Sequence, residues 1–205
     1  MNKLVKLVLI GLVLNLQVLA EEIQKSEMSF GIYTQIGQYI NDRNSTLWYR
    51  DSGIRFSKLP YDFNIKLLYK VYDGLGFVGE GNNYRAGIHI SKEFNVIDRF
   101  GIAPSIGGSF NGSNSVSGMS FSFDAGLELN YEPKLFGMVD ITAGGDILCF
   151  DKSYQIEYYG GLKVIIVPNF SISLLYTGLF YHEEHDLGSS NTHLLGYGVL
   201  LEFKF

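Results

Sequence analysis

Residues 193–205 read His-Leu-Leu-Gly-Tyr-Gly-Val-Leu-Leu-Glu-Phe-Lys-Phe. Side chains along a β-strand point alternately to its two faces, so this stretch has one apolar face and one mixed face. The apolar face carries Tyr197, Val199, Leu201, Phe203 and Phe205. The mixed face carries Gly196, Gly198, Glu202 and Lys204 beside Leu194 and Leu200. The alternation predicts a strand that is apolar on one face up to its final aromatic residue.

This stretch resembles the closing strand of bacterial outer-membrane β-barrels. In those proteins a C-terminal Phe, with apolar residues at every second position before it, is read by the barrel-assembly machinery. The resemblance implies outer-membrane lipid as the surroundings and the assembly machinery as a partner. It also implies an assembly signal made of Tyr197, Val199, Leu201, Phe203 and Phe205.

The N-terminal segment has the pattern of a secretory signal peptide. Lys3 and Lys6 precede an apolar run over residues 7–14, and Val18-Leu19-Ala20 precedes the acidic pair at 21–22. The run is too short for a membrane anchor. We therefore predict a cleaved signal peptide over residues 1–20 and a single barrel domain over residues 21–205.

Charge and cysteine content narrow the class of protein further. The formal net charge is −5, and cleavage would remove two of the lysines. An acidic chain lacks the clustered Lys and Arg of a nucleic-acid-binding surface, so nucleic acid is not expected as a partner. Cys149 is the only cysteine and cannot form an internal disulfide. Past the leader no apolar run is long enough for a membrane helix, which leaves a closed barrel as the way to span a membrane.

Alternation continues along most of the chain and predicts an all-β, single-domain, up-and-down antiparallel transmembrane barrel. Ten strands are favoured, and the count falls to eight if the second strand, which has the weakest pattern, is a loop and another segment is misread. Pro104 is awkward inside the fifth strand, because proline lacks the N–H that a ladder needs. The predicted strands cover residues 28–39, 48–58, 62–72, 83–93, 99–110, 118–131, 135–149, 154–166, 170–181 and 193–205. The connections alternate between short turns and longer polar loops, as periplasmic turns and outer loops do.

Alternation does not say which face points inward, and a soluble lipocalin-like barrel has the same period. The polar face is rich in Gly and Ser and poor in Lys, which favours a membrane barrel. Aromatic residues near the predicted strand ends would form two interfacial girdles. They are Tyr39, Trp48, Tyr84, Tyr154 and Tyr181 at the loop end, and Phe100, Tyr131, Phe170 and Phe205 at the turn end.

Charges on the polar face are sorted by sign. Basic residues lie on the second to fourth strands and acidic residues on the sixth to eighth: Arg55, Lys66, Lys70 and Arg85 against Asp124, Glu128, Asp140, Asp146 and Glu157. Ten strands tilted by about 40° enclose a cylinder with a radius of roughly 10 Å, so the two arcs face each other across a narrow lumen. They could line a small pore as a selectivity field, or they could pair as a plug of salt bridges.

A second cluster is predicted in the last outer loop, residues 182–192. It contains His182, Glu183, His185 and Asp186, a candidate ligand site. Barrel lipid A deacylases use Ser, His and Glu, and omptin-type barrel proteases use Asp and His, but the stretch matches neither motif. A weak divalent-metal site is a further reading, and a solvated acidic loop is the simplest one. We predict no enzyme activity, no catalytic residue, no resident metal and no cofactor.

The chain is similar in pattern to small outer-membrane barrels of spirochaetes and other diderm bacteria, some of which form modest pores and some of which bind host matrix proteins or complement regulators. That resemblance implies a bacterial outer-membrane location with loops at the cell surface. The favoured function is a small porin-like channel or a structural membrane protein. The alternatives are an adhesin that binds host extracellular proteins through its outer loops, and a rim enzyme acting on lipid or peptide.

Overall fold

The computed structural model describes residues 28–40, 46–73, 75–76, 79–80, 83–113, 119–133, 138–150, 153–185 and 188–205. The predicted signal peptide, residues 1–20, lies outside these residues. Nearly all of the described chain is β-strand. Within it, no helix has the length and apolar character needed to cross a membrane.

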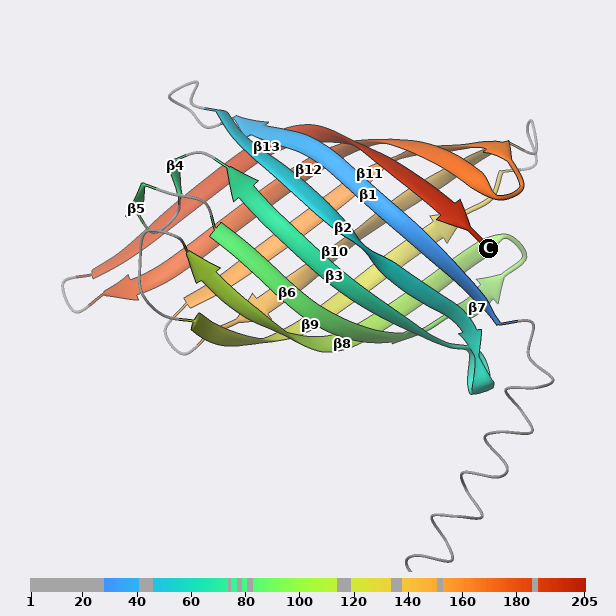
Figure 1. The fold of residues 1–205 in the computed structure, drawn as a ribbon, viewed down its shortest axis with the longest axis horizontal. Coiled ribbons are helices and arrows are strands. Elements are labelled where there is room, and N and C mark those ends of the chain that lie inside the picture. Colours follow the sequence, from blue (N-terminus) through green and yellow to red (C-terminus); the bar gives the residue numbers. More distant parts are fainter. Residues whose placement is uncertain are drawn as a thin grey trace, which may run out of the picture.

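The described strands form one closed antiparallel barrel (Figure 1). Each long strand pairs with the next along the chain, β13 pairs with β1, and the β6–β8 pairing completes the ring. The ring strands are β1 Ser29–Ile40, β2 Thr46–Leu59, β3 Phe63–Asp73, β6 Asn83–Lys92, β8 Phe100–Ser113, β9 Met119–Tyr131, β10 Val139–Cys149, β11 Ser153–Val167, β12 Phe170–His185 and β13 Gly188–Lys204. The prediction of an up-and-down barrel with ten strands is confirmed, and the strand with the weakest pattern, β2, belongs to the ring.

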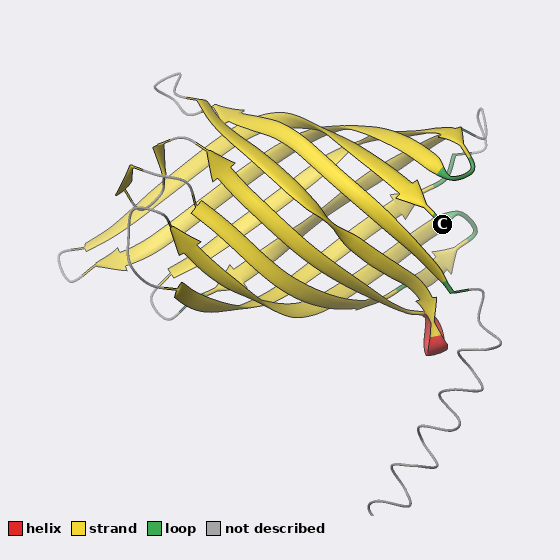
Figure 2. Ribbon diagram, viewed as in Figure 1, coloured by secondary structure: helices red, strands yellow, loops and turns green. Residues whose placement is uncertain are grey.

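Short elements occupy the connections between ring strands (Figure 2). A two-residue ladder joins β4 Leu75–Gly76 to β5 Gly79–Glu80, and the 3-10 turn η1 Pro60–Asp62 links β2 to β3. The short strand β7 Phe94–Ile97 continues the course of β6 and pairs with β8 only. Pro104 lies where β8 changes partner from β6 to β7, so the missing N–H falls beside an existing break in the ladder.

The apolar face of the strands points outward. Tyr197, Val199 and Phe203 on β13, and Phe205 just after it, are 41–63% exposed, whereas Leu194 and Glu202 are buried. Ser109, Ser122, Ser173 and Thr177, from other strands, are buried inside the ring at 0–2% exposure. An apolar exterior around a mostly polar interior suits lipid rather than water, which removes the soluble lipocalin-like alternative.

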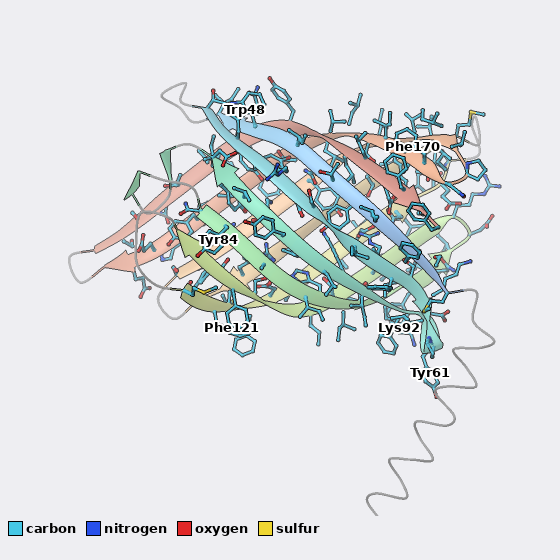
Figure 3. All side chains as sticks on the ribbon, in the orientation of Figure 1. Trp48, Tyr61, Tyr84, Lys92, Phe121 and Phe170 are labelled. Atoms are coloured by element: carbon cyan, nitrogen blue, oxygen red, sulfur yellow. The ribbon has the colours of Figure 1, made fainter. Side chains whose placement is uncertain are left out.

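Aromatic residues mark the two ends of the barrel wall. Figure 3 shows Trp48, Tyr84 and Phe121 toward one end and Phe170 and Tyr61 toward the other. Two predicted girdle residues are wrong, however: Tyr39 is 2% exposed inside the lumen, and Tyr181 packs against an apolar cluster there. Tyr39 shares the parity of the lumen-facing residues of β1, and parity decides its direction more strongly than its position near the strand end.

Candidate functional site: the closed lumen

An apolar layer lies in the lumen near the loop end. It consists of three cross-strand pairs, which the registers of β1–β2, β2–β3 and β12–β13 place directly opposite each other: Tyr39–Leu47, Tyr49–Tyr72 and Leu179–Leu194. All six side chains are at most 6% exposed. The six side chains come from five neighbouring strands of the ring: β12, β13, β1, β2 and β3.

Two glycines leave the space that the Tyr49 ring occupies in this layer. Its ring stacks on Tyr39 with 4.8 Å between the ring centroids, and its hydroxyl accepts a 2.7 Å hydrogen bond from Gln35 Nε2. It lies across Gly37 on β1 and Gly198 on β13, where a Cβ atom would come within 2.5 Å of the Tyr49 ring or hydroxyl. Both positions therefore need a residue without a side chain for the ring to lie flat.

Below the apolar layer, Glu157 on β11 gathers partners from across the barrel. Lys70 Nζ lies 2.5 Å from Glu157 Oε2, and Arg85 Nη1 lies 3.6 Å from Glu157 Oε1. Gln155 Nε2 donates to Oε1 at 2.6 Å, and the Tyr72 hydroxyl donates to the same oxygen. Such a buried carboxylate is tolerated because each of its oxygens is hydrogen-bonded or ion-paired.

Asp124 on β9 is the second centre of the network. Arg85 Nη2 and His89 Nε2 each lie 3.0 Å from Asp124 Oδ2. Ser122 donates to Oδ1 at 2.8 Å, and Ser109 donates to Oδ2. Ser, His and Asp meet here, but Ser109 and His89 both contact the carboxylate, whereas a catalytic triad requires the serine to contact the histidine. The cluster is therefore a buried polar network.

Further ion pairs lie toward the turn end. Arg55 Nη2 contacts Glu128 Oε2 at 3.1 Å, and Lys163 Nζ contacts Glu202 Oε2 at 2.7 Å. Lys66 Nζ lies 4.9 Å from the centroid of the Tyr33 ring. The lumen is thus bridged at several depths by side chains from both arcs.

The two remaining predicted lumen acids lie apart from these pairs. Asp146 Oδ1 is 3.8 Å from His89 Nδ1. Asp140 lines an open polar vestibule of about 440 Å³ at the turn end. The structure therefore joins Arg55, Lys70 and Arg85 to Glu128, Glu157 and Asp124, and leaves Asp140 beside solvent. A role for these nine residues in permeation stays a prediction.

A second cavity, of about 90 Å³, lies in the middle of the lumen. It is lined by Thr177, whose buried Oγ1 has no hydrogen-bond partner among the described residues. A cavity this large, lined by polar groups, has room for several waters. The lumen is therefore roomy and polar at its turn end, and it holds a polar cavity in its middle.

The lumen also holds groups that the sequence reasoning did not single out. Lys163 and Glu202 form an ion pair although both lie outside the two predicted arcs. Tyr33 donates to Asp51 at 3.1 Å. The polar parity of these residues was visible in the sequence, but their pairing depends on strand register.

The predicted outer loop over residues 182–192 is wrong, because most of it is strand. β12 continues to His185, β13 starts at Gly188, and the pairing reaches His185↔Gly188. His182 stacks on Tyr154 with 4.9 Å between ring centroids, and its Nδ1 lies 2.6 Å from Asn191 Oδ1. Asp186 lies outside the described residues, as does the His185 side chain. No group of three metal-ligating side chains occurs in the part of the chain that the structure describes.

A closed antiparallel barrel with an ion-paired polar interior and an apolar, aromatic-lined exterior defines the class of transmembrane β-barrels. No protein-family model matches the chain, and no curated protein sequence matches it.

Solved structures with a similar fold include Neisserial surface protein A, at 12% identity with a TM-score of 0.40, covering 87% of this chain and 97% of that one. The KdgM porin has 14% identity and a TM-score of 0.44, with coverage of 85% and 99%. The outer-membrane protease OmpT from Escherichia coli has 8% identity and a TM-score of 0.46, with coverage of 88% and 96%. These likenesses are ones of barrel fold alone, and nothing about activity follows from them.

Proposed function

We propose that the protein is an integral barrel of the bacterial outer membrane whose lumen is closed at rest, so that it acts as a structural membrane protein rather than as an open porin. The observation that carries this proposal is the apolar layer of Tyr39, Leu47, Tyr49, Tyr72, Leu179 and Leu194. Ions would have to lose their hydration to pass it, and the cross-lumen ion pairs beneath it would have to separate first.

A gated small channel is the second candidate function. The vestibule of about 440 Å³ at the turn end gives small polar solutes access as far as the Arg55–Glu128 pair. Beyond that pair, the ion pairs of Lys70 and Arg85 would have to separate and the apolar layer would have to move before a solute could pass. The vestibule supports this candidate, and the apolar layer with the ion pairs beneath it favours the structural role for the resting protein.

Single-channel recording separates the two functions. Residues 21–205 are refolded in detergent and inserted into planar bilayers, beside a Tyr49→Ala/Tyr72→Ala variant and a Tyr176→Ala control on the outer face. We expect silence from the wild type and the control, and discrete conductance steps from the double variant. Reproducible steps from the wild type would overturn the closed state and favour the channel.

A further inference from the structure

One arginine of the barrel wall points outward, on the face that meets lipid. The residues on either side of Arg50 in β2, Tyr49 and Asp51, line the lumen. Arg50 is exposed and shares the outer face with Trp48, which Figure 3 shows toward the loop end. Arg50 makes no ion pair, hydrogen bond or ring contact with the residues that the structure describes. A guanidinium at the lipid surface is costly without a partner, so this position calls for an anionic group.

A second outward basic residue, Lys92, has partners within the protein. It lies at the turn end of β6, and its Nζ is 5.5 Å from the centroid of the Phe63 ring and 5.6 Å from that of Phe94. The two aromatic faces attract the ammonium group. Arg50 lacks such support in the described part of the chain, so a partner for it has to come from outside the protein.

The depth of Arg50 indicates what that partner is. Arg50 lies two residues from Trp48, or about 7 Å along β2. Because barrel strands tilt by about 40°, Arg50 is about 5 Å deeper in the membrane than the aromatic girdle. An arginine side chain is long enough to carry its guanidinium back to the girdle level. The anionic groups at that level of a bilayer are lipid phosphates.

Further hydrogen-bond donors face lipid beside Arg50. Gln38 on β1 lies directly opposite Trp48, and its side-chain amide donates to the Tyr197 hydroxyl on β13. That hydroxyl keeps its own proton to donate, and the Trp48 indole N–H makes no hydrogen bond with the described residues. Arg50, Trp48, Gln38 and Tyr197 thus form a donor patch across three adjacent strands. A phosphate group, which offers several acceptor oxygens, complements such a patch.

A second copy of the chain is a poorer occupant than a lipid. A twofold interface would bring the same patch to both sides and set donors against donors. The acidic residue Asp73 lies opposite Trp48, two residues nearer the loop end than the register partner of Arg50, Val71. Arg50 does not pair with Asp73 within the chain. The whole chain has a formal net charge of −5, so a preference for anionic lipid has to arise locally, at the patch.

We propose that the donor patch of Arg50, Trp48, Gln38 and Tyr197 binds the phosphate of an anionic lipid in the leaflet at the loop end. The guanidinium and the neighbouring donors hold the headgroup. The acyl chains lie along the apolar residues below it on β1 and β2, where Ile32, Ile36 and Ile54 are 38–53% exposed. The site requires the barrel to span a membrane, as the proposed function also does, but it does not depend on whether the lumen conducts.

Trp48 provides a direct test, because it is the only tryptophan of the chain and belongs to the patch. The barrel is inserted into vesicles of phosphatidylcholine with a minority of phosphatidylglycerol, and bromine is placed on the chains of one lipid or the other. The ratio of the two quenching efficiencies gives the preference for the anionic lipid beside Trp48. We expect roughly a fivefold preference at low salt, as for one cation near the membrane surface. High salt should reduce it.

Four variants locate the source of the preference. Arg50→Gln should abolish it, and Arg50→Lys should keep part of it, because lysine carries the charge without the planar fork. Asp73→Asn should increase it by removing a nearby negative charge. Lys92→Gln is the matched control, since it removes an outward charge at the other end of the barrel, and the preference should equal that of the wild type.

Equal quenching by the two lipids in the wild type, or an unchanged preference in Arg50→Gln, would overturn the proposal. So would a change in oligomeric state in Arg50→Gln with the lipid preference unaltered, because the patch would then bind a second copy. Failure of the wild type to insert into vesicles would overturn the proposed function as well, whereas insertion without a lipid preference would overturn this proposal alone.

Discussion

Lys70 Nζ lies 2.5 Å from Glu157 Oε2, although β3 and β11 are opposite strands of the ring. This contact spans the lumen and shows that the two arcs of charge meet instead of facing each other across an open channel. Both residues are buried, and Glu157 also accepts from Tyr72 and Gln155. The interior of the barrel is therefore held together across its diameter as well as around its wall.

Removal of one member of this pair should destabilise the barrel strongly. Glu157→Gln leaves Lys70 buried without its counter-charge, and we expect a loss of about 3 kcal/mol in the free energy of unfolding. Lys70→Met should cost less, because Arg85 still lies beside Glu157. Adding Lys70→Met to Glu157→Gln should recover part of the loss.

Urea unfolding followed by the fluorescence of Trp48 measures these changes, with the exposed Lys204→Met as a matched control. Simple additivity of the two single losses would show that the pair is not energetically coupled.

A methyl group at residue 37 should disturb the apolar layer. In Gly37→Ala the new Cβ would come within 2.5 Å of Tyr49 Cζ and 2.6 Å of the Tyr197 carbonyl oxygen. We expect a loss of about 1–3 kcal/mol from overpacking, together with leak conductance as Tyr49 is displaced. In the matched Gly160→Ala, the Cβ makes only an ordinary 3.9 Å contact with Ala143.

The same bilayer and unfolding measurements apply to both glycine variants. The Gly160 variant should stay within about 0.5 kcal/mol of the wild type and remain silent. A similar response of the two would mean that Tyr49 does not depend on the glycine beneath it.

A lysine introduced on the outer face should lower the stability of the barrel more strongly the deeper it lies in the bilayer. Ile106 is 70% exposed near the middle of β8, and Val96 is 53% exposed on β7 at the turn end. Ile106→Lys should cost about 2–4 kcal/mol in lipid, and Val96→Lys about 0–1 kcal/mol. Unfolding from lipid vesicles measures the difference, and folding in detergent alone should reduce it. Equal costs in vesicles would place the apolar band elsewhere on the barrel.

Alternation predicted the up-and-down strand order and most of the lipid-facing side chains, with Tyr39 and Tyr181 as exceptions. Phe121, Phe123 and Leu127 share the apolar parity of β9, and they are 46–72% exposed. This works because lipid imposes an apolar residue at every second position within the membrane band. Beyond that band the constraint ends, and for this reason the polar extension from His182 to Thr192 looked like a loop, although its backbone continues the ladder.

For the lumen, the sequence predicted which charged residues point inward but not how they pair. Polar parity placed Arg85 and Asp124 inside, and their order along the chain placed them in facing arcs. Which basic residue meets which acidic one depends on register and on side-chain length, and neither leaves a periodic signal. The apolar layer was missed for a related reason: Tyr39 and Leu179 interrupt the polar parity as isolated residues, and their common depth appears only when distant strands are aligned.

Phe205 allows recognition by the assembly machinery to be separated from stability. The Phe205 N–H donates to the Phe30 carbonyl oxygen at 2.8 Å, and the Phe205 ring stacks on the Phe30 ring with 5.0 Å between centroids.

Phe205→Ala keeps the main-chain bond and loses about 1 kcal/mol of ring contact, so refolding in detergent should change little. If Phe205 is part of the assembly signal, this substitution should lower the amount of folded barrel in the outer membrane of cells at least tenfold. Phe110→Ala, which breaks an outward pair with Phe121 at 5.4 Å, is the control for ring loss elsewhere. Equal yields from the two variants in cells would show that the machinery does not read Phe205, since their stability losses are comparable.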